Sequence, residues 1–265
     1  MKIAVISPVH GQTGNTVTSL FLAMSLALTQ RKNVCLTHTD FSSTTIEEVL
    51  GLDLEEDVTR SLSQVFKLLS SGTLLEKELA DYAIHVMQGL DLYTSHNVVL
   101  EHDELVGFIE FLFNRMKIYH HIVIDVDTEL KDKTSELCLS IADTVIITVS
   151  QNYHVLRMAK RLVQREDFKK LTKNKRILYV INRFNTDICK LADVAKQLGA
   201  KTKDIIIIHD NVFITRCYNA GMIEDVIKRV LLKDIRVLEL YNDIRNACRI
   251  LLGKDFIWKD TTSGK

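Results

Sequence analysis

Short runs of β-branched and aliphatic residues alternate with longer helical stretches, and this alternation constrains the fold more than any other feature of the sequence. The clearest runs lie at residues 122–126, 144–149, 177–181 and 205–208. Residues 155–164 and 188–198 have the length and apolar periodicity of helices between such runs. Strands that alternate with helices favour a mostly parallel sheet covered by helices on both faces. The sequence therefore predicts an α/β fold.

Both ends of the chain fit this prediction. Further strands are expected at residues 2–7, 34–39 and 90–95, and further helices at residues 16–30, 61–69, 74–87 and 103–117. Near the C-terminus, apolar residues recur at helical spacing: Leu231, Ile235, Leu238, Ile244, Cys248 and Leu251. We interpret this stripe as a helix docked on the sheet. A helix that binds a partner or a membrane surface is the alternative.

Length and composition indicate one soluble domain. The chain has 265 residues, of which 46% are hydrophobic and 26% charged, which is typical of a globular protein. We expect a single domain over residues 1–254 and a polar tail over residues 255–265. The scattered cysteines show no paired spacing and indicate a cytoplasmic protein. No apolar stretch approaches the roughly 18 residues of a spanning helix, and the tail lacks the pattern of a strong membrane-targeting helix.

The net charge is zero and favours neither nucleic acid nor membrane as a partner. The distribution of charge says more. Residues 157–176 contain nine Lys and Arg against two acids, Glu166 and Asp167. Such a run is usually a solvated helix face. Non-specific DNA binding, or binding of lipid or an acidic partner, is the alternative.

A glycine-containing turn joins the first predicted strand to the first predicted helix. It contains Gly11, Gln12, Thr13 and Gly14 and leads into Asn15, Thr16 and Val17 at the helix start. A turn of this kind points backbone N–H groups at one place, where the helix dipole also favours an anion. A full P-loop reads GxxxxGK[ST]. Gly14 and Thr16 match its last glycine and hydroxyl, but Asn15 replaces the lysine. By itself the pattern also fits a tight strand-to-helix turn.

Six blocks in order make the sequence resemble the ParA/MinD family of deviant P-loop ATPases. Residues 10–16 align with the family's KGGxGKT loop, and residues 34–40 align with its second strand, with His38 at the first acidic position and Asp40 at the second. The remaining blocks are residues 121–125, 141–148, 179–183 and 207–221. The resemblance implies a three-layer P-loop fold.

The resemblance also implies roles for individual residues. ATP or ADP would bind the loop, Mg²⁺ would be held by Thr16 and by Asp125, and Asp40 would lie near the attacking water. Residues Asn182, Arg183 and Asp210 match positions near the nucleotide, and the asparagine matches one that contacts the base. For Asp40, capping of the following turn is an equal alternative.

Both lysines of the family loop are replaced, by His10 and by Asn15. Phosphoryl transfer needs positive charge that offsets the charge on the transferring group, and the amide of Asn15 carries none. A cationic His10 beside a phosphate would replace part of this charge, although we prefer a neutral loop histidine. We therefore expect nucleotide binding through backbone amides, with very slow or absent hydrolysis.

Three functions follow. The first is a pseudo-ATPase that positions or assembles a cellular machine, such as a pilus, secretion or conjugation system. It is what a resemblance to the atypical TadZ/CpaE group implies, which rests on residues 49–51 and on the missing PPG after Asp125. The second is a slow ATPase for plasmid or chromosome partition that binds DNA through residues 157–176. The third is a scaffold that binds no nucleotide. The resemblance implies a homodimer, and we expect a cytoplasmic protein recruited by its partner to a membrane or pole.

Overall fold

The computed structural model describes residues 1–11, 13–30, 33–39, 45–52, 62–73, 76–94, 102–126 and 132–256. Its strands are β1 (Lys2–Ile6), β2 (Val34–His38), β3 (Ile84–Met87), β4 (Leu90–Tyr93), β5 (His121–Asp125), β6 (Thr144–Val149), β7 (Arg176–Phe184) and β8 (Ile205–His209). They form one eight-stranded sheet in the order β3-β4-β2-β5-β1-β6-β7-β8. All neighbouring pairs are parallel except β3 and β4. The predicted α/β sheet is confirmed.

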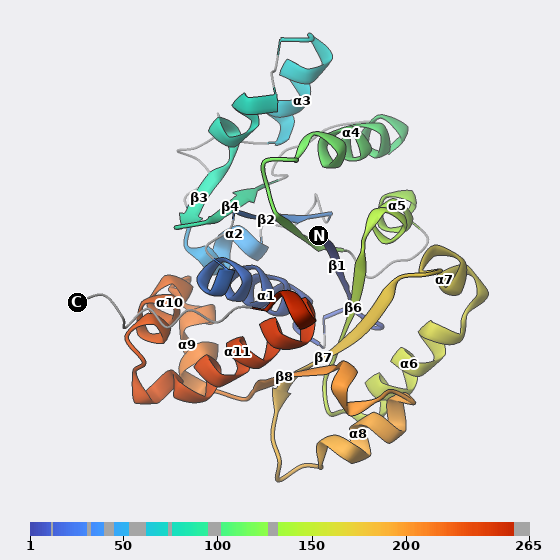
Figure 1. The fold of residues 1–265 in the computed structure, drawn as a ribbon, viewed down its shortest axis with the longest axis vertical. Coiled ribbons are helices and arrows are strands. Elements are labelled where there is room, and N and C mark those ends of the chain that lie inside the picture. Colours follow the sequence, from blue (N-terminus) through green and yellow to red (C-terminus); the bar gives the residue numbers. More distant parts are fainter. Residues whose placement is uncertain are drawn as a thin grey trace.

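Helices cover both faces of this sheet (Figure 1). One layer contains α3 (Leu62–Ser70), α4 (His102–Arg115), α5 (Lys133–Ile141), α6 (Tyr153–Gln164), α7 (Glu166–Leu171) and α8 (Leu191–Leu198). The other contains α1 (Asn15–Gln30), α2 (Thr45–Leu50), α9 (Val212–Asn219), α10 (Ile223–Leu231) and α11 (Leu238–Leu252). Short 3-10 helices occur at η1 (Glu76–Tyr82), η2 (Thr202–Asp204), η3 (Ile235–Val237) and η4 (Gly253–Asp255).

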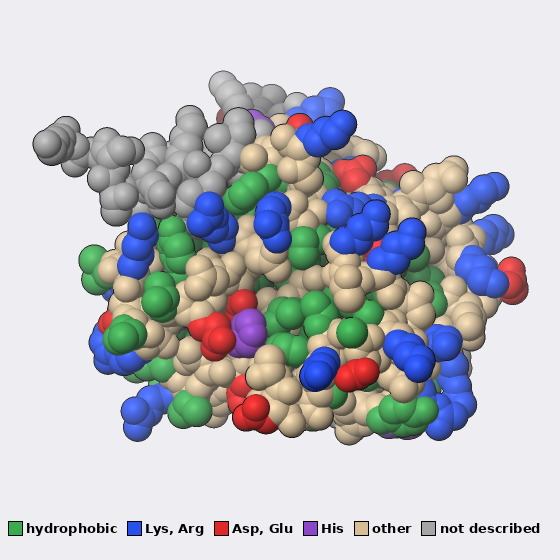
Figure 2. Space-filling model, turned by 60° about the horizontal axis from the view of Figure 1, so that its bottom comes forward, with side chains coloured by type: hydrophobic (Ala, Val, Ile, Leu, Met, Phe, Trp, Pro, Cys, Tyr) green, Lys and Arg blue, Asp and Glu red, His purple; other side chains and the backbone are tan. Residues whose placement is uncertain are grey.

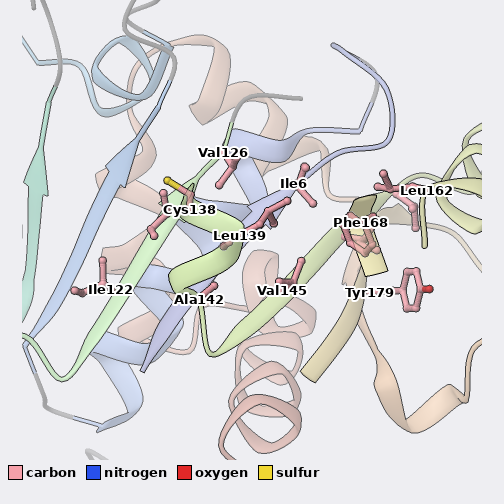
Figure 3. Close-up of a cluster of buried hydrophobic side chains, with 14 of the residues drawn as sticks. Ile6, Ile122, Val126, Cys138, Leu139, Ala142, Val145, Leu162, Phe168 and Tyr179 are labelled. Atoms are coloured by element: carbon pink, nitrogen blue, oxygen red, sulfur yellow. The ribbon is translucent and has the colours of Figure 1, made fainter. Parts of the chain in front are cut away.

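Each face of the sheet packs against helices in a hydrophobic core, and each central strand contributes side chains to both cores because successive side chains point to opposite faces. In β1, Ala4 and Ile6 belong to the core under α4 to α8, whereas Ile3 and Val5 belong to the core under α1 and α11. Figure 3 shows part of the first core, where Phe168 of α7 and Leu162 of α6 lie near Val145 of β6. Strands buried on both faces read as continuous apolar runs, which explains why the sequence identified them.

Two predictions about secondary structure need correction. A single helix over residues 74–87 is wrong, because the described part of this segment forms η1 and then β3. Strand β3 forms a hairpin with β4, and Gly89 in the turn has a φ of 83°. The C-terminal stripe is also divided. Ile244, Cys248 and Leu251 are buried in α11, but Leu231, Ile235 and Leu238 are exposed.

Among the described residues, no helix is long and apolar enough to cross a bilayer. Because the seven parallel strands point the same way, their carboxyl ends meet at one edge of the sheet. The loop after β1, His38 at the end of β2 and Asp125 at the end of β5 all lie there. His38 and Asp125 are register partners across the β2–β5 pair. This edge is where the topology brings the predicted site residues together.

Candidate nucleotide site

The loop between β1 and α1 depends on two glycines with left-handed backbone. Gly11 has a φ of 73° and Gly14 a φ of 71°, a conformation that costs other residues free energy. A Cβ atom on Gly14 would also lie 2.3 Å from Nδ2 of Asn182, whereas one on Gly11 would contact nothing within 4 Å. Position 14 therefore requires glycine for both conformation and space.

The side chain of Asn182 binds the backbone of this loop. Its Nδ2 donates to the carbonyl oxygens of Thr13, at 3.2 Å, and Gly14, at 3.3 Å. The side chain is only 5% exposed. The structure thus gives Asn182 a contact with the loop backbone. Contact with a base stays a prediction for this residue.

The loop borders a cavity of about 330 Å³. Most of the predicted loop residues line it. The described residues that line it are Ser7, Val9, His10, Gly11, Thr13, Gly14, Asn15, Thr16, His38, Thr45, Ile46, Asp125, Val126 and Tyr218. The predicted residues Val17, Asn182, Arg183 and Asp210 are not among the lining residues. Gln12 and Asp40 lie outside the described residues.

The first turn of α1 faces this cavity. Its first intrahelical hydrogen bond runs from the N–H of Thr18 to the carbonyl of Gly14, at 2.9 Å. The N–H groups of residues 15–17 precede that bond and belong to the helix N-terminus. The aligned peptide dipoles make this end of a helix favourable for an anion. Val17 can therefore contribute a backbone N–H although its side chain does not line the cavity.

Asn15 directs its amide toward the strand ends beside the cavity. Its Nδ2 donates to Oδ1 of Asp125 at 2.6 Å, to the carbonyl of Val126 at 3.1 Å and to that of Val5 at 3.2 Å. The side chain at the P-loop lysine position is thus neutral and already engaged. It adds no positive charge to the cavity.

Asp125 accepts hydrogen bonds from three side chains. Besides Asn15, the hydroxyl of Thr16 donates to Oδ2 at 2.7 Å and that of Ser19 to Oδ1 at 3.1 Å. Burial raises the pKa of the Asp125 carboxyl above its ordinary value, and these hydrogen bonds together with the nearby His38 oppose that rise. The Thr16 hydroxyl and the Asp125 carboxylate are oxygen donors of the kind that Mg²⁺ prefers. They lie close enough to share one ion, so the residues present fit the predicted metal.

Beside Asp125, at the end of β2, His38 belongs to a buried polar group that was not predicted as part of the site. Nε2 of His38 lies 3.2 Å from Oε1 of Glu47, which also accepts from the hydroxyl of Thr94. Burial alone would raise the pKa of Glu47, but the hydrogen bond and charge of His38 and the bond from Thr94 lower it below its ordinary value. This arrangement fixes the His38 ring at the cavity wall.

Sequence reasoning missed other residues of the site. Ser19 does not line the cavity but donates to Asp125, and because it lies one helical turn after Thr16, an i, i+3 search from the loop would have found it. Tyr218 comes from α9 and reaches the cavity only because α9 packs beside α2. No local signal in the sequence predicts that contact.

The order of the strands and the arrangement of the helices match the MinD/ParA P-loop NTPase fold. No protein-family model matches this chain. A search of curated proteins also finds no match.

Solved structures show the particular proteins that share this fold. The cell division protein MinD of Aquifex aeolicus has a TM-score of 0.68 and 20% identity, over 98% of this chain and 100% of that chain. The septum site-determining protein MinD of Pyrococcus horikoshii, complexed with Mg-ADP, has a TM-score of 0.70 and 17% identity, over 96% and 99%. A ParA family ATPase of Chlorobium tepidum has a TM-score of 0.66 and 17% identity, over 85% and 92%. Because these identities are 20% or lower, the comparison establishes the fold alone.

Proposed function

We propose that this chain is a ParA/MinD-like protein that binds ATP or ADP, hydrolyses it very slowly or not at all, and acts in the positioning or assembly of a cellular machine. The observation that carries the proposal is the environment of Asn15. A neutral amide replaces the P-loop lysine and donates to Asp125 at 2.6 Å. The glycine loop, the helix N-terminus and the oxygen donors around it are retained.

Nucleotide binding is supported by the loop geometry and by the chemistry of the cavity. Backbone N–H groups at the start of α1 would hold the phosphates. Thr16 and Asp125 would hold Mg²⁺, which supplies positive charge beside the phosphates when bound. The MinD structure with Mg-ADP has the same fold, which supports the same class of ligand here.

Slow hydrolysis follows from the charge of the lining. In the part of the chain that the structure describes, His10 and His38 are the only Lys, Arg or His residues that line the cavity. Interactions that strengthen in the transition state speed the reaction most, and a lysine at the loop provides one of them. Loss of this charge should reduce turnover more than it weakens binding.

The proposal is tested by calorimetry with Mg-ATP on the native chain and on Gly14→Val. We expect saturable binding that Gly14→Val abolishes, because a side chain there meets Asn182. Gly72→Val is the matched control, because Gly72 also has a positive φ, of 69°, but its Cβ would contact nothing within 4 Å. Absence of binding at millimolar ATP would reject the nucleotide site and favour the nucleotide-free scaffold.

Turnover tests the second half of the proposal. We expect phosphate release near the detection limit. A rate comparable to that of a ParA/MinD ATPase with an intact loop, abolished by Asp125→Ala, would contradict slow hydrolysis. The role as a positioning protein of the TadZ/CpaE type, acting as a homodimer, rests on the sequence blocks. Co-purification of a pilus or secretion component with the native chain would support this role, if the component is lost when a cavity variant is purified in the same way.

A second candidate is a partition ATPase that binds DNA through the basic run at residues 157–176. Arg157, Lys160 and Arg161 are exposed on α6, and Lys and Arg side chains gather on the right of Figure 2, where Figure 1 places α6, α7 and α8. Part of the run has other partners. Arg165 pairs with Asp167 and Lys169 with Glu166, while Lys175 and Arg176 donate to backbone carbonyls.

DNA binding would fall steeply with salt, because each neutralised phosphate releases counterions. Lys160→Gln with Arg161→Gln should weaken it and reduce the salt slope, whereas Lys67→Gln with Lys117→Gln, at exposed positions outside the basic run, should not. Binding that barely changes with salt would reject this candidate.

A further inference from the structure

Aliphatic side chains project from the turn that joins α10 to α11. Leu232 is 79% exposed and Ile235 is 86% exposed, and Leu231 and Leu238 beside them are 48% and 45% exposed. Val212, the first residue of α9, is 82% exposed. Nδ2 of the preceding Asn211 donates to the carbonyl of Arg236 at 2.9 Å, which brings the start of α9 to this turn. We call these five apolar residues the apolar turn.

The apolar turn is held in a fixed conformation. Lys233 adopts a left-handed backbone with a φ of 53°, which is unusual for a residue with a side chain. The Asp234 carboxylate accepts from Nη1 of Arg229 at 2.8 Å, from Nη2 of Arg236 at 2.5 Å and from the N–H of Arg236 at 3.0 Å. Val237, between the exposed residues, is fully buried. The turn is thus anchored by its ion pairs and by Val237, while Leu232 and Ile235 stay outside the core.

Basic side chains surround the apolar turn. Residues 228–238 contain Lys228, Arg229, Lys233 and Arg236 against one acid, Asp234, which gives a net charge of +3 (four minus one). The left edge of Figure 2, where Figure 1 places α9 and α10, shows hydrophobic and basic side chains next to one another. Glu239, the next acid, is 3.8 Å from Nε2 of His209 and so faces another neighbour.

We propose that the apolar turn is a docking site for an anionic lipid surface. Side chains that are about four-fifths exposed project from the molecule, and a fluid bilayer accepts projecting aliphatic groups without a matching groove. Lys and Arg next to apolar side chains place their charge at the headgroups while their stems lie along the acyl boundary. The net charge of +3 beside these side chains complements the negative surface of such a bilayer. None of the five residues of the apolar turn is among the described residues that line the nucleotide cavity.

The proposal is tested by flotation of the full chain, without nucleotide, with vesicles of equimolar phosphatidylglycerol and phosphatidylcholine and with vesicles of phosphatidylcholine alone. We expect binding to the anionic vesicles only. The double variant Leu232→Ser with Ile235→Ser should reduce the vesicle affinity at least about tenfold, because two aliphatic side chains leave the bilayer. Lys228→Gln and Lys233→Gln should each reduce it about fivefold.

Ile188→Ser is the matched control, because Ile188 is 65% exposed on another part of the surface, and it should bind as the native chain does. Circular dichroism of each variant checks the fold. Equal binding by the Leu232→Ser and Ile235→Ser variant would overturn the proposal. So would absence of binding to either kind of vesicle, which would leave the apolar turn to a protein partner or a second copy of the chain.

Discussion

At position 15 a neutral amide lies among three oxygen acceptors. Its Nδ2 contacts the Val5 and Val126 carbonyls and the Asp125 carboxylate, so the amide orientation is determined, because Oδ1 would be repelled there. Oδ1 itself is buried and has no hydrogen-bond partner among the described residues. Asn15 therefore joins the loop to β5, and it does so without the positive charge that a lysine would bring to the cavity.

Asn15→Lys should increase the affinity for Mg-ATP by about one to two decades, because a charged hydrogen bond is worth roughly 1.5–3 kcal/mol. Calorimetry on Asn15→Lys and on Asn15→Met, which has a long uncharged side chain, separates charge from size. We expect no gain from methionine. If lysine binds no more tightly than methionine, charge at position 15 does not limit affinity.

On the scale of elements, α11 is tied to the end of β8 by one carboxylate. Asp243 accepts from the N–H of His209 and from its Nδ1, both at 2.8 Å. Burial raises the pKa of Asp243 to about 6, although the hydrogen bonds and charge of His209 oppose the rise. The side chain is only 7% exposed, so the native fold favours its protonated form relative to the unfolded chain.

This raised pKa predicts a dependence of stability on pH. An unfolded Asp titrates at about 3.9. The stabilisation from protonated Asp243 is therefore fully present below about pH 4 and is lost as the pH rises to about 6. We expect this group to lower the free energy of unfolding by roughly 1–3 kcal/mol over that range.

Urea denaturation at several pH values, on the native chain and on Asp243→Asn, measures this effect. The variant has no carboxyl at this position, so the difference between the two curves isolates Asp243. A difference that stays constant between about pH 4 and pH 6 would contradict the raised pKa.

On the scale of the whole molecule, one sheet separates two cores. Cys138 lies in the core under α4 to α8 and Cys248 in the core under α1 and α11, and both thiols are fully buried. Burial raises the pKa of each thiol to about 12, so neither should react with a thiol reagent in the native state. Because the two cores share every central strand, we expect them to unfold together.

Phe168→Ala should lower the free energy of unfolding by about 3–5 kcal/mol, because it opens a cavity in the first core. The urea concentration at which Cys138 reacts with a thiol reagent should fall in this variant, and that for Cys248 should fall equally. Phe111→Ala removes the same atoms from a side chain that is 37% exposed and should cost far less. Separate labelling transitions for the two thiols would reject a single cooperative domain.

The sequence could predict those parts of the fold that depend on local pattern. Strands buried on both faces, such as β6 and β8, are continuous apolar runs. Glycine at positions 11 and 14 marks the loop, where both residues have a positive φ. Strand β3 was mistaken for the end of a helix, because a short apolar segment of mixed burial fits both periods, whereas β4 lies within the strand predicted at residues 90–95. The apolar stripe near the C-terminus was likewise divided between core and surface.

The α/β class, the glycine loop and the replacement of both family lysines can be read from residue type and from neighbours along the chain. The contacts of each site residue instead depend on how distant segments pack. Tyr218 reaches the cavity, Asn182 holds Gly14, and Asp125 meets donors from α1 across more than a hundred residues. Parallel strands need long crossover connections, so their carboxyl ends gather residues that are distant in sequence, and packing alone sets those contacts.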